Sequence, residues 1–259
     1  MQQIEKVLAI ANKHNLYPKP PIVRVAPSEP LIELDGRTYF NFASNNYLGL
    51  ANHLEVKKAV IEGIEQYGVG TCASRLDMGN TEAHLTLERR LSEFLGVDDV
   101  VATSSGYLTN VGVIPTVIDR AFLFEHRAKE KIDFGVIFSD EKNHASIVDG
   151  IRLSRAERVV YKHCDMEDLD RKMKPFRNRR KLLVSDAVFS VDGDIAPLNG
   201  LVALKERYGA LLMLDEAHSF GTLGTKGKGI SEYYGVDPHT IDIDMGTLSK
   251  ALGSVGGNI

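Results

Sequence analysis

The chain has 259 residues but only two cysteines, no long apolar run and no excess of positive charge. Cys72 and Cys164 lie far apart, which offers no zinc-binding spacing and fits a reducing compartment such as the cytoplasm. No apolar segment approaches the roughly 18 residues of a membrane span, and the N-terminus does not resemble a signal peptide. The net charge of −4 argues against a nucleic-acid partner. We also predict no metal site.

Several motifs that would identify common enzyme classes are absent from the sequence. It contains no G-x-S-x-G nucleophile elbow and no H-E-x-x-H zinc motif. Residues 224–229 (GTKGKG) have neither dinucleotide-binding nor Walker spacing, so they predict a plain turn. The basic cluster at 171–181 predicts a solvated helix end and loop rather than a phosphate site.

Apolar periodicity indicates an α/β protein. Residues 4–12 have a helical period, 31–34 and 37–42 flank an Asp35-Gly36 turn typical of a β-hairpin, and 53–67 and 81–95 predict helices, the second ended by Gly96. Beyond these, short strands are expected at 100–102, 135–138, 159–161, 182–184, 211–214 and 241–245, separated by helices or loops at 107–117, 144–153, 166–173 and 198–208. Such alternation predicts a mostly parallel sheet with helices on both faces.

Polar residues follow several of these strands at the edge where α/β proteins bind ligands. The apolar run 211–214 leads to Asp215 and His218, and the run 241–245 leads to a small loop, 246–250, that carries Lys250. Asp140 and Asp186 also lie at strand ends. A lysine, an acid and an imidazole on neighbouring strand ends are what a pyridoxal phosphate (PLP) site requires, with a helix N-terminus at Ser105-Gly106 available for the phosphate.

Seven motifs, in order, resemble those of the α-oxoamine synthases, a branch of the fold-type I PLP enzymes. The resemblance runs from about residue 30 onward through NFASNNYLGL (41–50), YGVGT (67–71), SGYLTN (105–110), SDEKNHASIVDGI (139–151), FSVDGDIAPL (189–198), LDEAHSFG (214–221) and GTLSKALGSVGG (246–257). It implies an aspartate-aminotransferase-like large domain over 46–259, preceded by an arm and hairpin over 1–45. The family's C-terminal small domain would then be missing.

The resemblance assigns roles to individual residues. Lys250 matches the Schiff-base lysine, Asp215 the acid paired with the pyridine nitrogen, and His144 the histidine stacked on the ring. Further matches are expected near the phenolic oxygen, the phosphate and the substrate. They are His218 and Ser190 at the oxygen, Gly106, Tyr107, Thr247 and Ser249 at the phosphate, Asn46 near the substrate carboxylate, and Arg75 at the mouth of the site. The role of Asp186 is left open.

The expected activity is condensation of a small amino acid with an acyl-CoA, usually with decarboxylation, by a homodimer with a shared active site. Serine palmitoyltransferase of sphingolipid biosynthesis is the first choice, with glycine C-acetyltransferase and 8-amino-7-oxononanoate synthase as alternatives. Two hypotheses from other classes are a non-catalytic partner subunit and a PLP-dependent aminotransferase. We also expect a charged surface insertion at 125–131, in which His126 is solvated rather than catalytic.

Overall fold

The computed structural model describes residues 2–16, 20–23, 26, 28–118 and 133–259. The chain divides into two compact units, Met1–Ser44 and Asn45–Ile259. The first contains helix α1 (Gln2–Lys13) and an antiparallel hairpin of β1 (Leu31–Leu34) and β2 (Arg37–Phe40). Asp35 and Gly36 turn the hairpin with φ angles of 51° and 73°, the left-handed values that a tight two-residue turn needs. The predicted hairpin is therefore confirmed.

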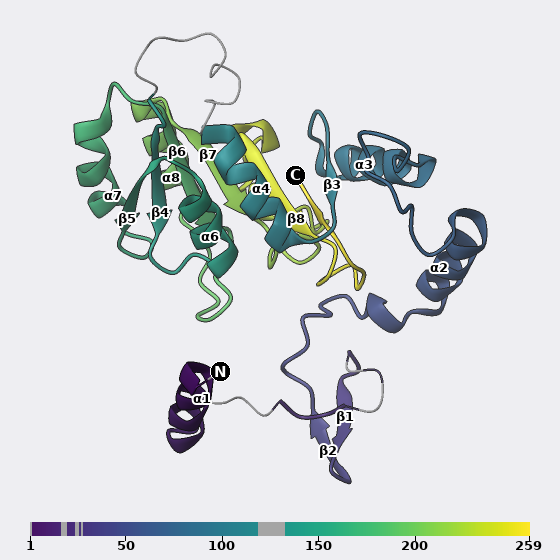
Figure 1. Ribbon diagram of the computed structural model, residues 1–259. Helices are drawn as coiled ribbons and strands as arrows, with labels where there is room; N and C mark the ends of the chain where they lie inside the picture. The colour runs from purple at the N-terminus through teal and green to yellow at the C-terminus, as the bar shows by residue number, and fades with distance from the viewer. Residues whose placement is uncertain (1, 17–19, 24–25, 27, 119–132) are drawn as a thin grey trace. The chain divides into compact units, whose positions relative to one another are not determined.

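The second unit is built on a seven-stranded sheet in the order β3-β9-β8-β7-β6-β4-β5 (Figure 1). Strands β4 to β8 pair in parallel, whereas β9 pairs antiparallel with both β3 and β8. The prediction of a mostly parallel sheet is confirmed. The strands are β3 (Ala102–Thr103), β4 (Val136–Asp140), β5 (Glu157–Tyr161), β6 (Lys181–Asp186), β7 (Leu211–Asp215), β8 (Ile243–Thr247) and β9 (Gly257–Asn258).

The second unit also contains the helices that the sequence pattern predicts, together with short turns of 3-10 helix. Thr81 caps the start of α3, and Gly96 ends it in the left-handed conformation, as predicted. The helices are η1 (Leu50–Asn52), α2 (Leu54–Tyr67), α3 (Glu82–Leu95), α4 (Gly106–Ile118), α6 (Ala145–Leu153), α7 (Met166–Met173), η2 (Lys174–Phe176), α8 (Leu198–Tyr208), α9 (Ile230–Tyr234) and η3 (Pro238–Thr240).

Alternate residues of the central strands pack into two cores on opposite faces of the sheet. Phe138 and Leu183 lie in a core with α7, α8 and α9, whereas their neighbours Ile137 and Leu182 lie in a core with α4 and α6. Successive side chains of a strand point to opposite faces, so strands covered on both sides must be apolar throughout. This burial explains why the central strands have continuous apolar sequences.

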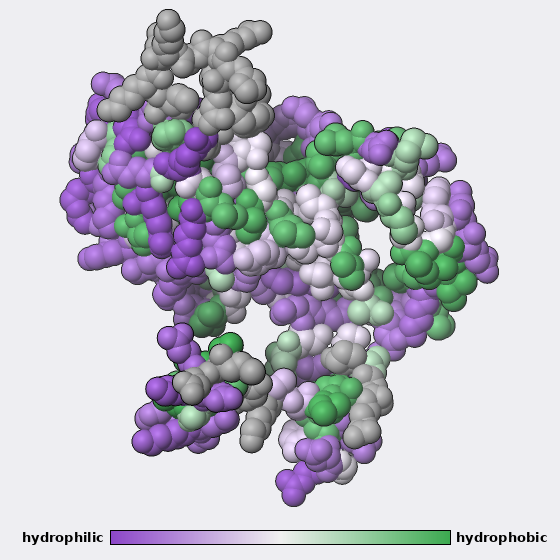
Figure 2. All heavy atoms as spheres, viewed as in Figure 1, coloured by the Kyte–Doolittle hydropathy of each residue, from purple (hydrophilic) through white to green (hydrophobic). Residues whose placement is uncertain are grey.

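Helix α2 differs from the other long helices of this unit because none of its residues is buried. Leu54, Val60, Ile61 and Ile64 are exposed, and Figure 2 shows the apolar surface over this helix. No helix in the described part of the chain is both long and apolar enough to cross a bilayer.

The basic cluster and the glycine-rich segment have structural partners. Thr225 and the backbone nitrogens of Lys226 and Lys228 donate to Glu232, which closes residues 224–229 into the predicted turn. The predicted solvated role is wrong for Lys181, which is buried on β6 and donates to backbone carbonyls. Several other cations of the cluster are held in ion pairs within the protein. They are Arg171 and Lys172 with Asp168, Lys174 with Asp170, and Arg179 with Asp133 and Glu157. The predicted insertion at 125–131, including His126, lies outside the described residues.

Candidate functional site

A cavity of about 250 Å³ lies beyond the carboxyl ends of β6, β7 and β8. The predicted strand-end residues Asp186, Asp215 and Lys250 all contribute to it. Other segments far apart in the chain complete its wall, as expected where helices and loops meet the edge of a parallel sheet. The lining residues are Ser105, Gly106, Tyr107, His144, Ser146, Asp186, Asp215, Ala217, His218, Met245, Thr247, Ser249 and Lys250.

Lys250 belongs to a short chain of polar side chains. Its Nζ lies 2.8 Å from Nε2 of His218, whose Nδ1 lies 2.6 Å from the Tyr47 hydroxyl. Burial lowers the Lys250 pKa, although Asp215 and Asp186 oppose this effect. Burial, followed by the charges of Lys250 and His144, lowers the His218 pKa to about 4. A neutral imidazole donates at one nitrogen and accepts at the other, so His218 can pass a proton between Tyr47 and Lys250.

Asp215 is the last residue of β7, and its carboxyl group is buried. Oδ1 accepts a hydrogen bond of 3.0 Å from the backbone nitrogen of Ala217, and Oδ2 accepts one of 2.7 Å from Nδ2 of Asn110. Burial raises the Asp215 pKa, whereas these two donors and the nearby Lys250 act in the opposite direction. The donors therefore favour the carboxylate in an environment that would otherwise disfavour its charge.

His144 caps the N-terminus of α6 on the other side of the cavity. Its Nδ1 accepts from the backbone nitrogen of Ser146 at 3.2 Å and lies 2.7 Å from the Ser146 hydroxyl. The backbone nitrogen of His144 donates to Asp186, although the distance of 3.4 Å is long. Burial, followed by the nearby Asp215, raises the Asp186 pKa well above its usual value. Asp186 and Asp215 are register partners on β6 and β7, so two carboxyl groups lie side by side in the site.

The N-terminus of α4 forms a third wall of the cavity. A Cβ atom added to Gly106 would lie 3.2 Å from Cβ of Thr247, which shows how closely this turn approaches β8. The hydroxyls of Thr247 and Ser249 lie 2.8 Å apart. The side chain of Tyr107 donates to Asp149 at 2.7 Å. Free backbone N–H groups at a helix N-terminus, together with two hydroxyls, are suited to an anion.

Three of the predicted site residues are not among those that line this cavity. Ser190 is exposed on the loop that follows β6. Asn46 accepts a hydrogen bond from the backbone of Ala51 at 3.1 Å. Arg75 forms a two-point ion pair with Glu88, at 2.5 and 2.9 Å, and also donates to Asn80 and to the carbonyl of Ala102. These contacts hold the Arg75 guanidinium against α3 and β3.

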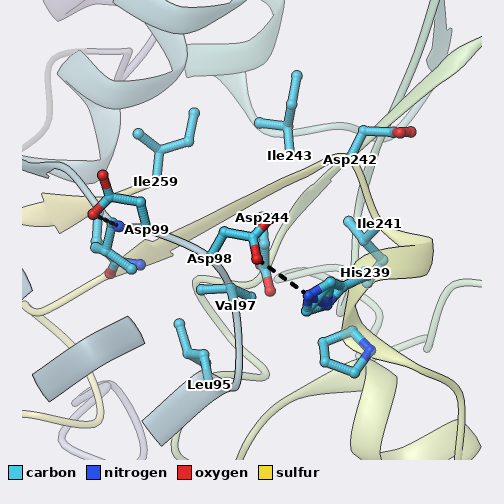
Figure 3. Close-up of a pocket in the computed structure, with 13 residues that line it drawn as sticks. Leu95, Val97, Asp98, Asp99, His239, Ile241, Asp242, Ile243, Asp244 and Ile259 are labelled. Carbon is cyan, nitrogen blue, oxygen red and sulfur yellow. Dashed lines mark hydrogen bonds and ion pairs between the residues drawn. The ribbon is translucent and has the colours of Figure 1, made fainter. Parts of the chain in front are cut away.

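A second cavity, of about 280 Å³, lies between the end of α3 and the start of β8 (Figure 3). Carboxyl groups and aliphatic side chains surround it, and His239 lies 3.5 Å from Asp98. The described residues that line it include no lysine. Although it is slightly the larger cavity, it lacks an amine for carbonyl chemistry, so we base the function on the site around Lys250.

Sequence reasoning missed Tyr47, Asn110 and Ser146 as members of the site. Each lies beside a residue that was predicted: Tyr47 follows Asn46, Asn110 lies one helical turn after Gly106, and Ser146 lies two residues after His144. The helical spacing of four residues is the signal that could have indicated Asn110.

Comparison with known proteins gives consistent results. The profile of the aminotransferase class I and II family matches residues 37–259. The chain is 45% identical over 258 residues to an 8-amino-7-oxononanoate synthase of Thermoanaerobacter pseudethanolicus, covering 99% of this chain and 62% of that protein. It is 48% identical over 223 residues to one of Geobacter sulfurreducens, covering 86% and 54%.

Among solved structures, the fold matches a serine palmitoyltransferase variant from S. paucimobilis with a bound PLP–myriocin aldimine. The TM-score is 0.87 at 30% identity, and the match covers 99% of this chain and 64% of that one. The chain thus spans between 54% and 64% of the length of these proteins. These matches confirm the predicted resemblance to the α-oxoamine synthases and the predicted fold class.

Proposed function

Because the chain belongs to the aminotransferase class I and II family, we propose that it is a PLP-dependent acyltransferase that joins an amino acid to an acyl-CoA. The observation that carries the proposal is the convergence of a buried acid, a desolvated lysine, two histidines and a helix N-terminus on one cavity. The names of the similar proteins and the PLP held by the matched structure support it.

The chemistry of the cavity fits PLP. Asp215 would face the pyridine nitrogen, Lys250 the aldehyde carbon, and the α4 N-terminus with Thr247 and Ser249 the phosphate. His144 would cover the ring and His218 would face the phenolic oxygen. When bound, the cofactor supplies an electron sink for a carbanion formed beside the amino group of the substrate.

The residues around Lys250 are suited to moving a proton. Its lowered pKa favours the neutral amine, which is the form that can act as a base. His218, which is neutral near pH 7 because its pKa is about 4, contacts this amine at 2.8 Å without adding a second positive charge. A noncatalytic partner subunit would not require this arrangement, so the geometry favours an enzyme.

Among the three candidate reactions, we favour that of an 8-amino-7-oxononanoate synthase, because the two similar proteins of that name are 45% and 48% identical whereas the serine palmitoyltransferase is 30% identical. In this product, carbons 8 and 9 with the amine correspond to alanine without its carboxylate. Carbons 1 to 7 correspond to a seven-carbon acyl group that ends in a carboxylate. The α-carbon of alanine would bond to the acyl carbon while the thioester C–S bond and the C–CO₂ bond break, releasing coenzyme A and carbon dioxide.

Serine palmitoyltransferase, the first choice from the sequence, becomes the second candidate, supported by the TM-score of 0.87. Similar folds host different substrates, so the sequence identity has more weight here.

To distinguish the candidates, alanine, glycine and serine are each supplied with a seven-carbon dicarboxylic acyl-CoA, acetyl-CoA or palmitoyl-CoA, and thiol release is followed. We expect release with alanine and the dicarboxylic thioester. Release only with serine and palmitoyl-CoA would favour the second candidate, and amino transfer to a keto acid without thiol release would indicate an aminotransferase.

We further propose that the protein is a homodimer. The exposed apolar surface of α2 supports this, since such a surface is often buried against a partner. Light scattering of the purified protein tests the proposal, with twice the chain mass expected. A monomer at micromolar concentration would contradict it.

A further inference from the structure

Asn110, on the first turns of α4, is completely buried and contacts two different walls of the site. Its Nδ2 donates to Oδ2 of Asp215 at 2.7 Å and to Oγ of Ser146 at 2.9 Å. An amide nitrogen has two hydrogens, and both are used. Because Ser146 also contacts His144, one hydrogen-bonded path runs from Asp215 through Asn110 and Ser146 to His144.

The directions of these hydrogen bonds follow from the available donors. Ser146 Oγ accepts from Asn110, so its own hydrogen is free to point at Nδ1 of His144. The backbone nitrogen of Ser146 donates to the same Nδ1. Two donors at Nδ1 leave the ring proton of a neutral His144 on Nε2. The path therefore fixes the orientation of Asp215 and the tautomer of His144 together.

The oxygen atom of the Asn110 amide, unlike its nitrogen, is unfavourably placed. This atom, Oδ1, is buried and has no hydrogen-bond partner among the described residues. A buried polar atom without a partner destabilises the fold, and an apolar side chain of similar size would avoid this cost. Rotating the amide by 180° would place Oδ1 against the carboxylate, so contact with an ionised Asp215 determines the observed orientation.

We propose that Asn110 is a positioning residue that keeps Asp215 ionised and correctly oriented, and that couples Asp215 to His144 through Ser146. The inference deepens the proposed function and rests on it, because the ionised Asp215 matters for keeping the cofactor ring nitrogen protonated. Asn110 acts through Asp215, and Ser146 acts through His144.

The test measures protonation directly. The protein and its Asn110→Leu variant are loaded with PLP labelled with ¹⁵N at the ring nitrogen, and the ¹⁵N chemical shift is followed from pH 6 to 9. In the unaltered protein we expect the protonated position throughout. In Asn110→Leu we expect the ring nitrogen to lose its proton at a lower pH than in the unaltered protein. We also expect kcat to fall roughly 10- to 100-fold, as when other supporting residues are removed, with KM for the amino acid little changed.

Two further variants separate this role from general packing. Thr109→Val removes a buried hydroxyl from the same helix and does not touch Asp215, so its ¹⁵N signal should match that of the unaltered protein. Ser146→Ala keeps the bond between Asn110 and Asp215, so it should leave the ring nitrogen protonated while changing the ¹⁵N shifts of the His144 imidazole. If Asn110→Leu does not fold, Asn110→Ala removes the same donors and is measured in the same way.

The outcomes distinguish this inference from the proposed function. A folded, PLP-loaded Asn110 variant with an unchanged ¹⁵N profile overturns the inference alone. An unaltered protein whose bound PLP is unprotonated at neutral pH does the same. If the unaltered protein does not bind PLP on Lys250, the proposed function fails and the inference fails with it.

Discussion

Individual side chains in the site have properties that differ from those of the same residues in water. Lys250 and His218 both lose affinity for protons on burial, whereas Asp215 and Asp186 gain it. The amine and the imidazole are thereby shifted toward their neutral forms. Perturbed pKa values of this kind are concentrated in functional sites, which agrees with the proposed role of the cavity.

Tyr47 provides a test of the hydrogen bonds that link it through His218 to Lys250. Tyr47→Phe removes the hydroxyl 2.6 Å from His218 and leaves the ring in place. We expect PLP to bind still, kcat to fall roughly tenfold, and the acidic limb of the kcat–pH profile to shift, because His218 loses the group that orders its tautomer.

Tyr39→Phe, on exposed β2, makes the same chemical change at a residue that does not line the cavity and is the control. If both variants behave like the unaltered protein in a steady-state pH series, Tyr47 has no part in the proton chain.

At the scale of elements, charged contacts tie loops to the sheet. The loop that carries Arg75 is held to α3 by Glu88, whose Oε1 also accepts from the backbone of Ala102 on β3. His163, which follows β5, lies between Asp140 at the end of β4 and Asp194 on the loop that carries Ser190, at 3.0 Å from each. The contacts of Arg75 and of His163 hold segments of the second unit in place, although neither residue lines the cavity.

We predict that Arg75→Met lowers the free energy of unfolding by about 1–3 kcal/mol in urea titrations, because it leaves the buried Glu88 carboxylate without its partner. Arg89→Met breaks an exposed pair with Glu93 on the same helix and should cost only about 0.3–0.5 kcal/mol. Equal effects from the two variants would show that the Arg75 pair has no special structural role, and would return Arg75 to the predicted substrate site.

His163 predicts a pH dependence. Burial lowers its pKa, but hydrogen bonds to Asp194 and Asp140 outweigh burial, and the net pKa is raised above 6.5 despite nearby Lys142. Because the folded protein holds this proton more tightly than the unfolded chain, the added stability is complete below about pH 6.5 and is lost as pH rises through the higher folded value.

Relative to His163→Gln, the unaltered protein should therefore be more stable at pH 6 by about 0.5–1.5 kcal/mol and should lose much of that advantage by pH 9. The exposed His239→Gln serves as the control. Parallel stability–pH curves for the unaltered protein and His163→Gln would contradict the assignment.

An element or residue could be predicted where its role leaves a pattern in its own stretch of sequence. The central strands were predicted because burial on both faces makes them apolar throughout. Strand β3 was placed too early, at 100–102 instead of Ala102–Thr103, because a two-residue strand has no periodicity. For Asn110 the only local signal was its helical spacing from Gly106, since its partner Asp215 lies 105 residues away and its helix is mostly apolar.

For the whole molecule, the sheet brings together residues from six segments of the second unit, from Tyr47 to Lys250. The motifs predicted most of this set because the carboxyl ends of parallel strands share one edge. The motifs did not establish how Ser190, Asn46 and Arg75 lie relative to the cavity. The predicted ligand roles of these three residues stay predictions.

The central claim is that Lys250 binds PLP covalently in the cavity that contains Asp215 and His218. The purified protein is incubated with PLP, reduced with borohydride, digested and mapped by mass spectrometry, with Lys250→Ala and the turn variant Lys228→Ala treated in parallel. We predict one dominant phosphopyridoxyl adduct, on Lys250, which disappears only in Lys250→Ala. Adducts spread over surface lysines, with Lys250 unmodified, would contradict the account.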